Sequence, residues 1–135
     1  MRKKTLMSWN RPGSREWNRL MEELKHKLRK FAAARDWDQF HSPKNLAMAL
    51  SVEASEIVET FQWLTEEESY NLTGDRLENI KNEIGDVLIY LIRLSDKLGI
   101  DPLAAANEKN EINKTKYPAQ KVKGSAKKYT ELNER

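Results

Sequence analysis

The sequence predicts an all-α protein organised as a four-helix bundle. Apolar residues recur every three or four positions along most of the chain, helix-capping residues and prolines separate these stretches, and no segment alternates apolar and polar residues as a strand does. A chain of 135 residues fits one domain. We expect a flexible N-terminal segment over residues 1–13, the helical domain over residues 14–118 and a basic tail over residues 119–135.

The first two helices are predicted from their apolar faces. The first runs from about Ser14 to Asp36, and its apolar residues are Trp17, Leu20, Met21, Leu24, Leu28 and Phe31. The second has Ser42 as its N-cap and Pro43 in its first turn, which is a favoured helix start. Its apolar residues are Leu46, Ala47, Leu50, Ala54, Ile57, Phe61 and Leu64.

Two more helices follow a polar loop that we expect over residues 66–74. Asp75 is the predicted N-cap of the third helix, and Gly99 ends it. Pro102 begins the fourth helix, and Pro118 must end it because proline cannot continue a helix. We expect the tail beyond to be irregular. The third helix carries its apolar residues at Leu77, Ile80, Ile84, Val87, Leu88, Leu91 and Leu98.

The composition excludes several classes of protein. Without cysteine, the chain has neither a disulfide framework nor a thiolate metal site. No stretch reaches the roughly 20 apolar residues that a membrane span needs. The N-terminus is basic but lacks the apolar stretch of a signal peptide. We therefore expect a cytoplasmic protein that does not enter a membrane.

Charge is distributed unevenly along the chain. The formal net charge is only +3, but residues 53–86 hold ten acidic and two basic side chains, whereas residues 109–135 hold eight basic and three acidic ones. This pattern indicates one site for cations and another for anions. Two solvated faces of opposite sign would give the same pattern, so charge alone leaves both interpretations open.

Two pairs of carboxylates lie on consecutive predicted helices, Glu53 with Glu56 and Glu83 with Asp86. Residues three apart share a helix face, and both pairs flank the apolar face of their helix in the same way. If these faces pack together, four carboxylates meet at one edge of the core. Like charges need a cation there, and hard oxygen ligands favour Mg²⁺ or Mn²⁺. Gly85 would let two helices or the ion approach closely.

Two alternatives compete with this metal site. The first is a solvated acidic stripe without an ion. The second is a di-iron carboxylate bundle, which needs Glu-x-x-His pairs that face the bundle interior. The chain has one such pair, Glu23 with His26, and it lies opposite the apolar face of the first helix. We expect that pair to be exposed, which argues against di-iron chemistry.

The acidic pairs belong to a longer ordered series of residues. The series comprises Phe31 to Trp37, Gln39 to His41, Pro43 to Leu46, Glu59 to Trp63, Asp86 to Leu91, Lys109 to Asn113, Tyr117 with Pro118, and Gly124 to Thr130. Together these residues resemble the all-α nucleoside triphosphate pyrophosphatases, the MazG-like superfamily, and most closely its dCTP pyrophosphatase branch. The resemblance implies an oligomeric enzyme, a homotetramer of tight dimers, that cuts a nucleotide into a monophosphate and pyrophosphate.

The resemblance also implies roles for individual residues. The implied Mg²⁺ ligands are Glu53, Glu56, Glu83 and Asp86. The implied base pocket contains Trp37, Trp63 and Tyr90. Helical spacing agrees, because Trp63 follows Glu56 by seven residues and Tyr90 follows Asp86 by four, so each aromatic residue lies on the face of an acidic pair.

Phosphate contacts are expected on the fourth helix. The resemblance implies that Lys109 and Asn113 bind phosphate oxygens. Lys116 lies three residues after Asn113 on the same polar face, so we add it to this set. Taken alone, such a stripe is more often a solvated surface.

Two positions depart from the family pattern. Dimetal relatives often carry an additional Glu where this chain has Val52. The dCTP-preferring relatives carry a base-contacting histidine where this chain has Leu28. An apolar side chain offers the base no hydrogen bond, so we expect looser base selectivity, provided that no other residue such as His41 supplies the contact.

The expected substrate is dCTP-like or a modified deoxynucleotide, which would make the chain an enzyme of nucleotide-pool sanitation. In the expected reaction, a water molecule attacks the α-phosphorus and pyrophosphate leaves. Glu53 or Glu56 would orient or deprotonate that water, and Mg²⁺ would lower its pKa. The non-enzymatic alternative is a helical nucleotide sensor with the same pocket. A nucleic-acid-binding module is not supported, because the basic residues form no recognisable motif.

Overall fold

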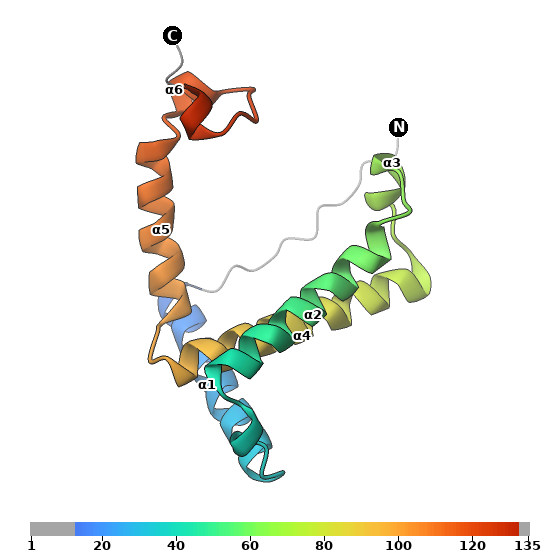
Figure 1. Ribbon diagram of the computed structural model, residues 1–135, viewed down its shortest axis with the longest axis vertical. Helices are drawn as coiled ribbons and strands as arrows, with labels where there is room; N and C mark the ends of the chain where they lie inside the picture. Colours follow the sequence, from blue (N-terminus) through green and yellow to red (C-terminus); the bar gives the residue numbers. More distant parts are fainter. Residues whose placement is uncertain (1–12, 133–135) are drawn as a thin grey trace. The chain divides into compact units, whose positions relative to one another are not determined.

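The computed structural model describes residues 13–132. These residues form six α-helices and two short 3₁₀ helices without a strand, which confirms the all-α class (Figure 1). The elements are α1 (Ser14–Ala33), η1 (Asp38–Phe40), α2 (Pro43–Phe61), α3 (Glu66–Ser69), α4 (Gly74–Lys97), α5 (Pro102–Lys116), α6 (Ala119–Val122) and η2 (Tyr129–Leu132). The four predicted helices correspond to α1, α2, α4 and α5. Except for Gly13, the predicted N-terminal segment lies outside the described residues.

The chain divides into two compact units between Leu94 and Ser95. The first unit contains α1, α2, α3 and most of α4, and it holds both acidic pairs and the three aromatic residues predicted to bind a base. The second unit contains the end of α4 together with α5, α6 and η2. In the part of the chain that the structure describes, no helix has the length and apolar character needed to cross a bilayer.

A tight turn after α1 positions Trp37. Asp36 adopts a left-handed backbone conformation with φ of 55°, which aspartate tolerates better than most residues. Its amide donates to the carbonyl of Ala33 at 3.1 Å, and the Trp37 amide donates to the carbonyl of Ala32 at 3.0 Å. This bond pair ends a helix in a Schellman motif. The helix therefore ends three residues earlier than predicted, and the Gln39 amide holds the turn by donating to the Asp36 carboxylate at 2.8 Å.

The start of α2 agrees with the prediction, whereas its end does not. The Asn45 amide donates to Ser42 Oγ at 3.2 Å, and Pro43 occupies the first turn. The helix ends at Phe61 and not near Leu64, because the chain leaves helical geometry after Gln62. Positions inferred from helical spacing along α2 therefore apply only as far as Phe61.

Three other stretches differ from the sequence prediction. The expected loop over residues 66–74 contains α3, because Thr65 and Glu68 form a reciprocal capping box that satisfies the first amides of a short helix. Asp75 lies inside the first turn of α4, which begins at Gly74, so it is not the N-cap. The expected irregular tail contains α6 and η2. Pro118 ends α5 as predicted, but its carbonyl then accepts from the Lys121 amide at 2.8 Å and starts the turn of α6.

The buried core is small relative to the apolar faces around it. The apolar residues that are buried are Ala32 of α1, Leu46 of α2, and Ile80 and Ile92 of α4. Many predicted apolar positions remain exposed in the single chain, among them Trp17, Phe31, Leu77, Ile84, Leu88 and Leu91. One copy of the chain therefore covers only part of the apolar faces that its helices present.

Candidate active site

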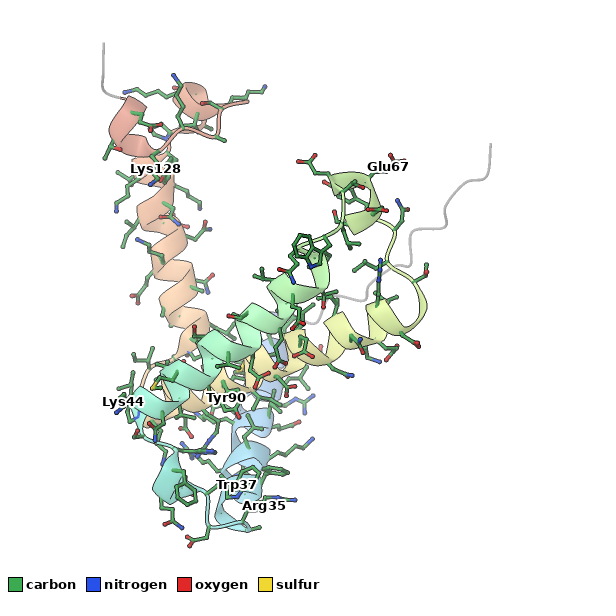
Figure 2. The ribbon with its side chains drawn as sticks, turned by 45° about the vertical axis from the view of Figure 1, so that its right-hand side comes forward. Arg35, Trp37, Lys44, Glu67, Tyr90 and Lys128 are labelled. Carbon is green, nitrogen blue, oxygen red and sulfur yellow. The ribbon has the colours of Figure 1, made fainter. Side chains whose placement is uncertain are left out.

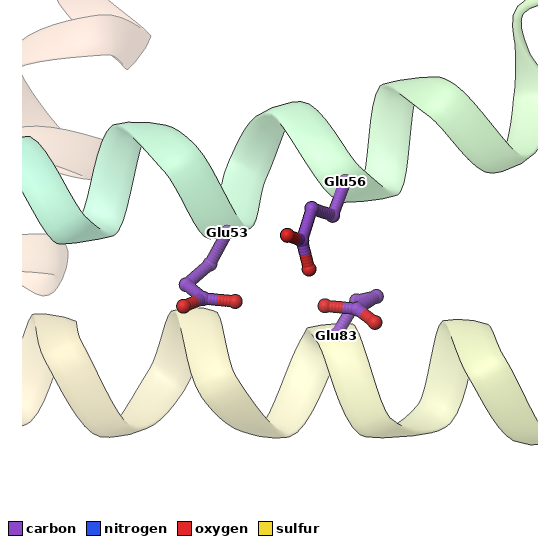
Figure 3. Close-up of side chains that lie close together, drawn as sticks. All are labelled: Glu53, Glu56 and Glu83. Atoms are coloured by element: carbon purple, nitrogen blue, oxygen red, sulfur yellow. The ribbon is translucent and has the colours of Figure 1, made fainter.

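Three carboxylates meet between α2 and α4, which lie side by side in the first unit (Figure 1). Glu53 and Glu56 point from α2 toward Glu83 of α4 (Figure 3). One carboxylate oxygen from each of the three residues lies within 4.8 Å of the others. The helical spacing of Glu53 and Glu56 and the packing of α2 beside α4 bring three of the four predicted carboxylates together in this acid cluster.

The electrostatic environment of the acid cluster favours protonation or a bound cation. Desolvation by burial raises the pKa of Glu53 above its usual value, and the charges of Glu56 and Asp86 raise it further. Desolvation also raises the pKa of Glu83, followed by a side-chain hydrogen bond with Glu56 and the neighbouring negative charges. Glu53 and Glu83 therefore hold their negative charges at a cost that a cation would remove.

Asp86 is one turn from Glu83 on α4, and its position differs from that of the other three carboxylates. Its oxygens are not part of the group that lies within 4.8 Å. Its negative charge nevertheless raises the pKa of both Glu53 and Glu83. Asp86 also lines the neighbouring cavity. The predicted set of four is thus three converging carboxylates and a fourth at the boundary between the acid cluster and a pocket.

The acid cluster is chemically suited to a divalent cation. Glu83 Oε2 is buried and has no hydrogen-bond partner among the residues that the structure describes. A buried acceptor without a partner is costly, and a metal ion would satisfy it. The donor set consists of carboxylate oxygens, which Mg²⁺ and Mn²⁺ prefer. The residues present therefore fit the ion that the sequence predicted.

A cavity of about 390 Å³ opens beside Asp86 in the same unit. Its lining comes from α1, the segment after α1, and α4: Lys27, Leu28, Phe31, Ala32, Trp37, His41, Asp86, Ile89, Tyr90 and Arg93. Trp37 and Tyr90 are labelled in Figure 2. Cavities of this size with apolar walls and a few polar groups are typical sites for small molecules.

The aromatic residues of the cavity are held by their neighbours. The Trp37 ring packs edge-on against Phe31, with 5.7 Å between ring centroids, and lies 6.3 Å from the His41 ring. The Arg35 guanidinium lies over the Phe31 ring, with its central carbon 3.6 Å from the ring centroid. Trp37 stays half exposed, so part of its indole remains accessible. The structure thus brings Trp37 and Tyr90 to one pocket, as the sequence predicted.

Comparison with known proteins relates this chain to one family. The sequence pattern of the MazG-like family matches residues 48–132, which is more than half of the chain. The chain belongs to the MazG-like family. It is 40% identical to dCTP pyrophosphatase 1 of Homo sapiens over 114 residues, covering 83% of this chain and 67% of the human protein. The Bos taurus dCTP pyrophosphatase 1 is 39% identical over 114 residues, with coverage of 83% and 68%.

A solved structure gives the same result. A pyrophosphatase from Archaeoglobus fulgidus aligns with this MazG-like chain with a TM-score of 0.69 and 43% sequence identity. The alignment covers 73% of this chain and 92% of the archaeal chain. Both acidic pairs lie inside the part that the family pattern matches, whereas Leu28 and Trp37 precede it.

Trp63 does not reach the pocket of this MazG-like chain. Its side chain is 85% exposed, and it does not line the cavity. The prediction placed Trp63 on the face of Glu56 by extending the helical spacing over seven residues. Because α2 ends at Phe61, that spacing does not apply to Trp63. Within one chain, Trp63 therefore does not line the cavity that holds Trp37 and Tyr90.

Arg93 lines the cavity, and sequence reasoning assigned it no role. Arg93 is buried, and its Nη2 donates to Asp38 Oδ1 at 2.8 Å. The same nitrogen lies 3.4 Å from His41 Nδ1. The signal was present in the sequence, because Arg93 follows Asp86 by seven residues and Tyr90 by three. All three therefore lie on one face of α4.

The remaining predicted positions behave differently. Lys109, Asn113 and Lys116 lie on α5 in the second unit, and all three are exposed. A Cβ atom added at Gly85 would meet no described neighbour within 4 Å. Among the described residues, no second helix comes this close to Gly85, so the expected close helix approach is not found within one chain.

Proposed function

We propose that this chain hydrolyses a deoxynucleoside triphosphate to the monophosphate and pyrophosphate, with Mg²⁺ bound by the acid cluster. The chain is a nucleotide pyrophosphohydrolase by its family and its relatives at about 40% identity. The observation that carries the finer proposal is the convergence of three carboxylates within 4.8 Å beside an aromatic pocket. The metal ion of the acid cluster would bind the phosphates, and the aromatic pocket beside it would bind the base.

The residues of the acid cluster would bind the metal ion and guide the water. Glu53, Glu56 and Glu83 supply the converging oxygens, and Asp86 adds a fourth carboxylate at the pocket side. When bound, Mg²⁺ neutralises charge on the phosphates and lowers the pKa of a coordinated water. Mn²⁺ suits the same oxygen ligands. Glu53 or Glu56 accepts a proton from the attacking water. The water oxygen then forms a bond to the α-phosphorus, and the bond between that phosphorus and the pyrophosphate leaving group breaks.

The pocket would hold the base by stacking. Trp37 and Tyr90 both line the cavity, and the aromatic packing around Trp37 fixes its position. Stacking on aromatic side chains accepts every base because every base has a π-face. The names of the mammalian relatives point to dCTP, so we propose a dCTP-like or modified deoxynucleotide as substrate and nucleotide-pool sanitation as the role.

Phosphate binding is proposed for the exposed polar face of α5. Lys109, Asn113 and Lys116 are spaced by four and three residues, so they share that face. Lysine and asparagine side chains donate hydrogen bonds to phosphate oxygens. Their contribution would appear as a higher KM for the triphosphate in Lys109→Met than in Lys121→Met, a lysine of α6 outside this set.

We propose that the enzyme is a homo-oligomer, as the resemblance to tetrameric relatives implied. Exposed apolar residues on α1, α2 and α4 support this, because soluble proteins rarely leave large apolar areas in water. In an assembly, the exposed Trp63 can contribute to the pocket of another copy. Light scattering of the full chain at micromolar concentration tests this, and a monomeric mass would contradict it.

Product analysis tests the proposed reaction. The protein with Mg²⁺ should convert dCTP to dCMP and pyrophosphate, and EDTA should stop turnover. Orthophosphate and dCDP as products would contradict the cleavage position. Binding of nucleotides without hydrolysis would support the alternative of a nucleotide sensor, which the convergence of three carboxylates argues against.

A further inference from the structure

Arg93 is a buried charged residue in the pocket wall that neither metal binding nor aromatic stacking requires. Its relative exposure is 3%, and it lines the cavity together with Leu28, Trp37 and Tyr90. Arginine is almost never buried unless it is paired. Its counter-ion is Asp38, which accepts from Nη2 at 2.8 Å. The ion pair holds the guanidinium at a fixed position in the wall.

The other ionisable residues of the cavity wall have different environments. The side chain of Lys27 is exposed, Asp86 adjoins the acid cluster, and His41 contacts Arg93 itself. Leu28 contributes no donor. Among the residues that line this cavity, Arg93 is therefore the buried cation from which a base can accept hydrogen bonds.

We propose that Arg93 determines base specificity by donating from its guanidinium to two adjacent acceptors on one edge of the base. A guanidinium presents five N–H donors in a rigid planar fork. Cytosine offers N3 and O2 as adjacent acceptors, and guanine offers N7 and O6, which arginine reads in nucleic acids. In thymine and uracil the N3–H donor lies beside both carbonyl acceptors, and in adenine the N6 amino donor lies beside N1 and N7. The inference rests on the proposed function, because it assigns the base edge that the same pocket selects.

This role reverses an expectation drawn from the sequence. Leu28 predicted loose selectivity, provided that no other residue supplies the base contact. Arg93 approaches the same cavity from α4, whereas Leu28 approaches it from α1. The α1 wall offers the base no donor at position 28, and the α4 wall offers the Arg93 guanidinium in its place. Selectivity then follows because a rigid guanidinium matches one base edge and does not match another.

Binding of non-hydrolysable nucleotides tests the proposal without relying on turnover. Isothermal titration of the full chain with α,β-methylene dCTP, dGTP, dTTP and dATP, in Mg²⁺, gives four affinities. We expect the cytosine or the guanine analogue to bind at least about tenfold more tightly than the thymine and adenine analogues, which is the scale of one bidentate pair. The comparison of the first two analogues shows which base carries the recognised edge.

Three variants separate base reading from a structural role. Arg93→Met keeps the aliphatic stem and removes every donor, so the preference should fall to less than about threefold. Arg93→Lys retains a cation for Asp38 but lacks the fork, so it should lose most of the preference even if Arg93→Met does not fold. Arg76→Met removes an exposed arginine from the same helix and should keep the wild-type ranking.

The outcomes are distinct from those that test hydrolysis. Equal affinities for all four analogues in the wild type, or an unchanged ranking in both Arg93 variants, would overturn the role of Arg93. If the protein cleaves dCTP but binds all four analogues with equal affinity, the proposed hydrolysis is supported and the role of Arg93 is contradicted. Selective binding that Arg93→Lys abolishes, without cleavage of any nucleotide, would support Arg93 and contradict the proposed hydrolysis.

Discussion

The acid cluster and the Arg93 end of the pocket lie on the same helix, but they manage charge in opposite ways. At the acid cluster, Glu83 faces two carboxylates of α2, and like charges converge within 4.8 Å. At the other end, Arg93 is buried against the carboxylate of Asp38 at 2.8 Å. The Arg93 pair is neutralised inside the chain, whereas the acid cluster depends on a cation from outside. One end of α4 therefore carries a charge that is paired within the chain, and the other carries charges that call for an external cation.

The largest expected effect comes from the acid cluster. Glu56→Gln should lower the rate of pyrophosphate release by about 100-fold or more, because it removes a metal ligand and a candidate base. Glu59→Gln is the matched control, since Glu59 lies three residues further along α2 and outside the acid cluster. The measurement is the steady-state rate with dCTP and Mg²⁺. Equal rates in the two variants would remove Glu56 from the chemistry.

The second effect is stabilisation by the ion. A ligand present at a hundred times its Kd stabilises the folded state by about 2.7 kcal/mol. Mg²⁺ should therefore raise the Tm of the wild type, and it should do so much less in Glu83→Gln. Thermal unfolding with and without Mg²⁺ measures both shifts. An equal shift in the two proteins would mean that the ion binds elsewhere.

The third effect concerns the opposite end of the helix. Asp38→Ala removes an acceptor of a buried guanidinium and should lower the free energy of unfolding by about 2 kcal/mol. Asp38 is itself partly exposed, so water offsets some of the loss. The control is Glu78→Ala, which breaks an exposed ion pair between Glu78 and Lys81 of α4. It should lower the free energy of unfolding by about 0 to 1 kcal/mol. Urea denaturation distinguishes them, and equal costs would contradict the importance of the buried pair.

The smallest effect is a dependence of metal-free stability on pH. Folding raises the pKa of Glu53 and Glu83 above the usual 4.5. These two carboxyl groups therefore bind protons more tightly in the folded state than in the unfolded state. Their contribution to folding stability is complete below about pH 4.5 and is lost as pH rises through the raised pKa values. Glu68 has a lowered pKa and acts in the opposite direction. The difference in Tm between Glu83→Gln and the wild type should widen in favour of the variant as pH rises, and Mg²⁺ should narrow it.

Sequence patterns predicted the features that depend on helical periodicity. The four long helices, the Ser42 cap of α2 and the convergence of Glu53, Glu56 and Glu83 all follow from residues three or four apart on continuous helices. Trp63 lies two residues beyond the end of α2, and it does not line the cavity with Trp37 and Tyr90. A prediction by spacing holds only while the backbone stays helical.

Features that depend on contacts between elements were beyond the sequence. The pairing of Arg93 with Asp38 joins positions 55 residues apart, and no local pattern specifies such a contact. The short helix α3 was overlooked, although Thr65 and Glu68 form a recognisable capping box. The exposure of Leu88 and Leu91 was also hidden, because periodicity identifies an apolar face without showing what covers it.

A titration with Mn²⁺ most directly tests whether the acid cluster is a metal site. Free Mn²⁺ has a strong EPR signal, so its decrease on addition of metal-free protein reports binding without nucleotide or turnover. We expect the wild type and Glu59→Gln to bind Mn²⁺ with equal affinity, and Glu56→Gln to bind at least about tenfold more weakly because it loses a charged oxygen ligand. Equal binding by Glu56→Gln and Glu59→Gln would contradict a metal site between α2 and α4.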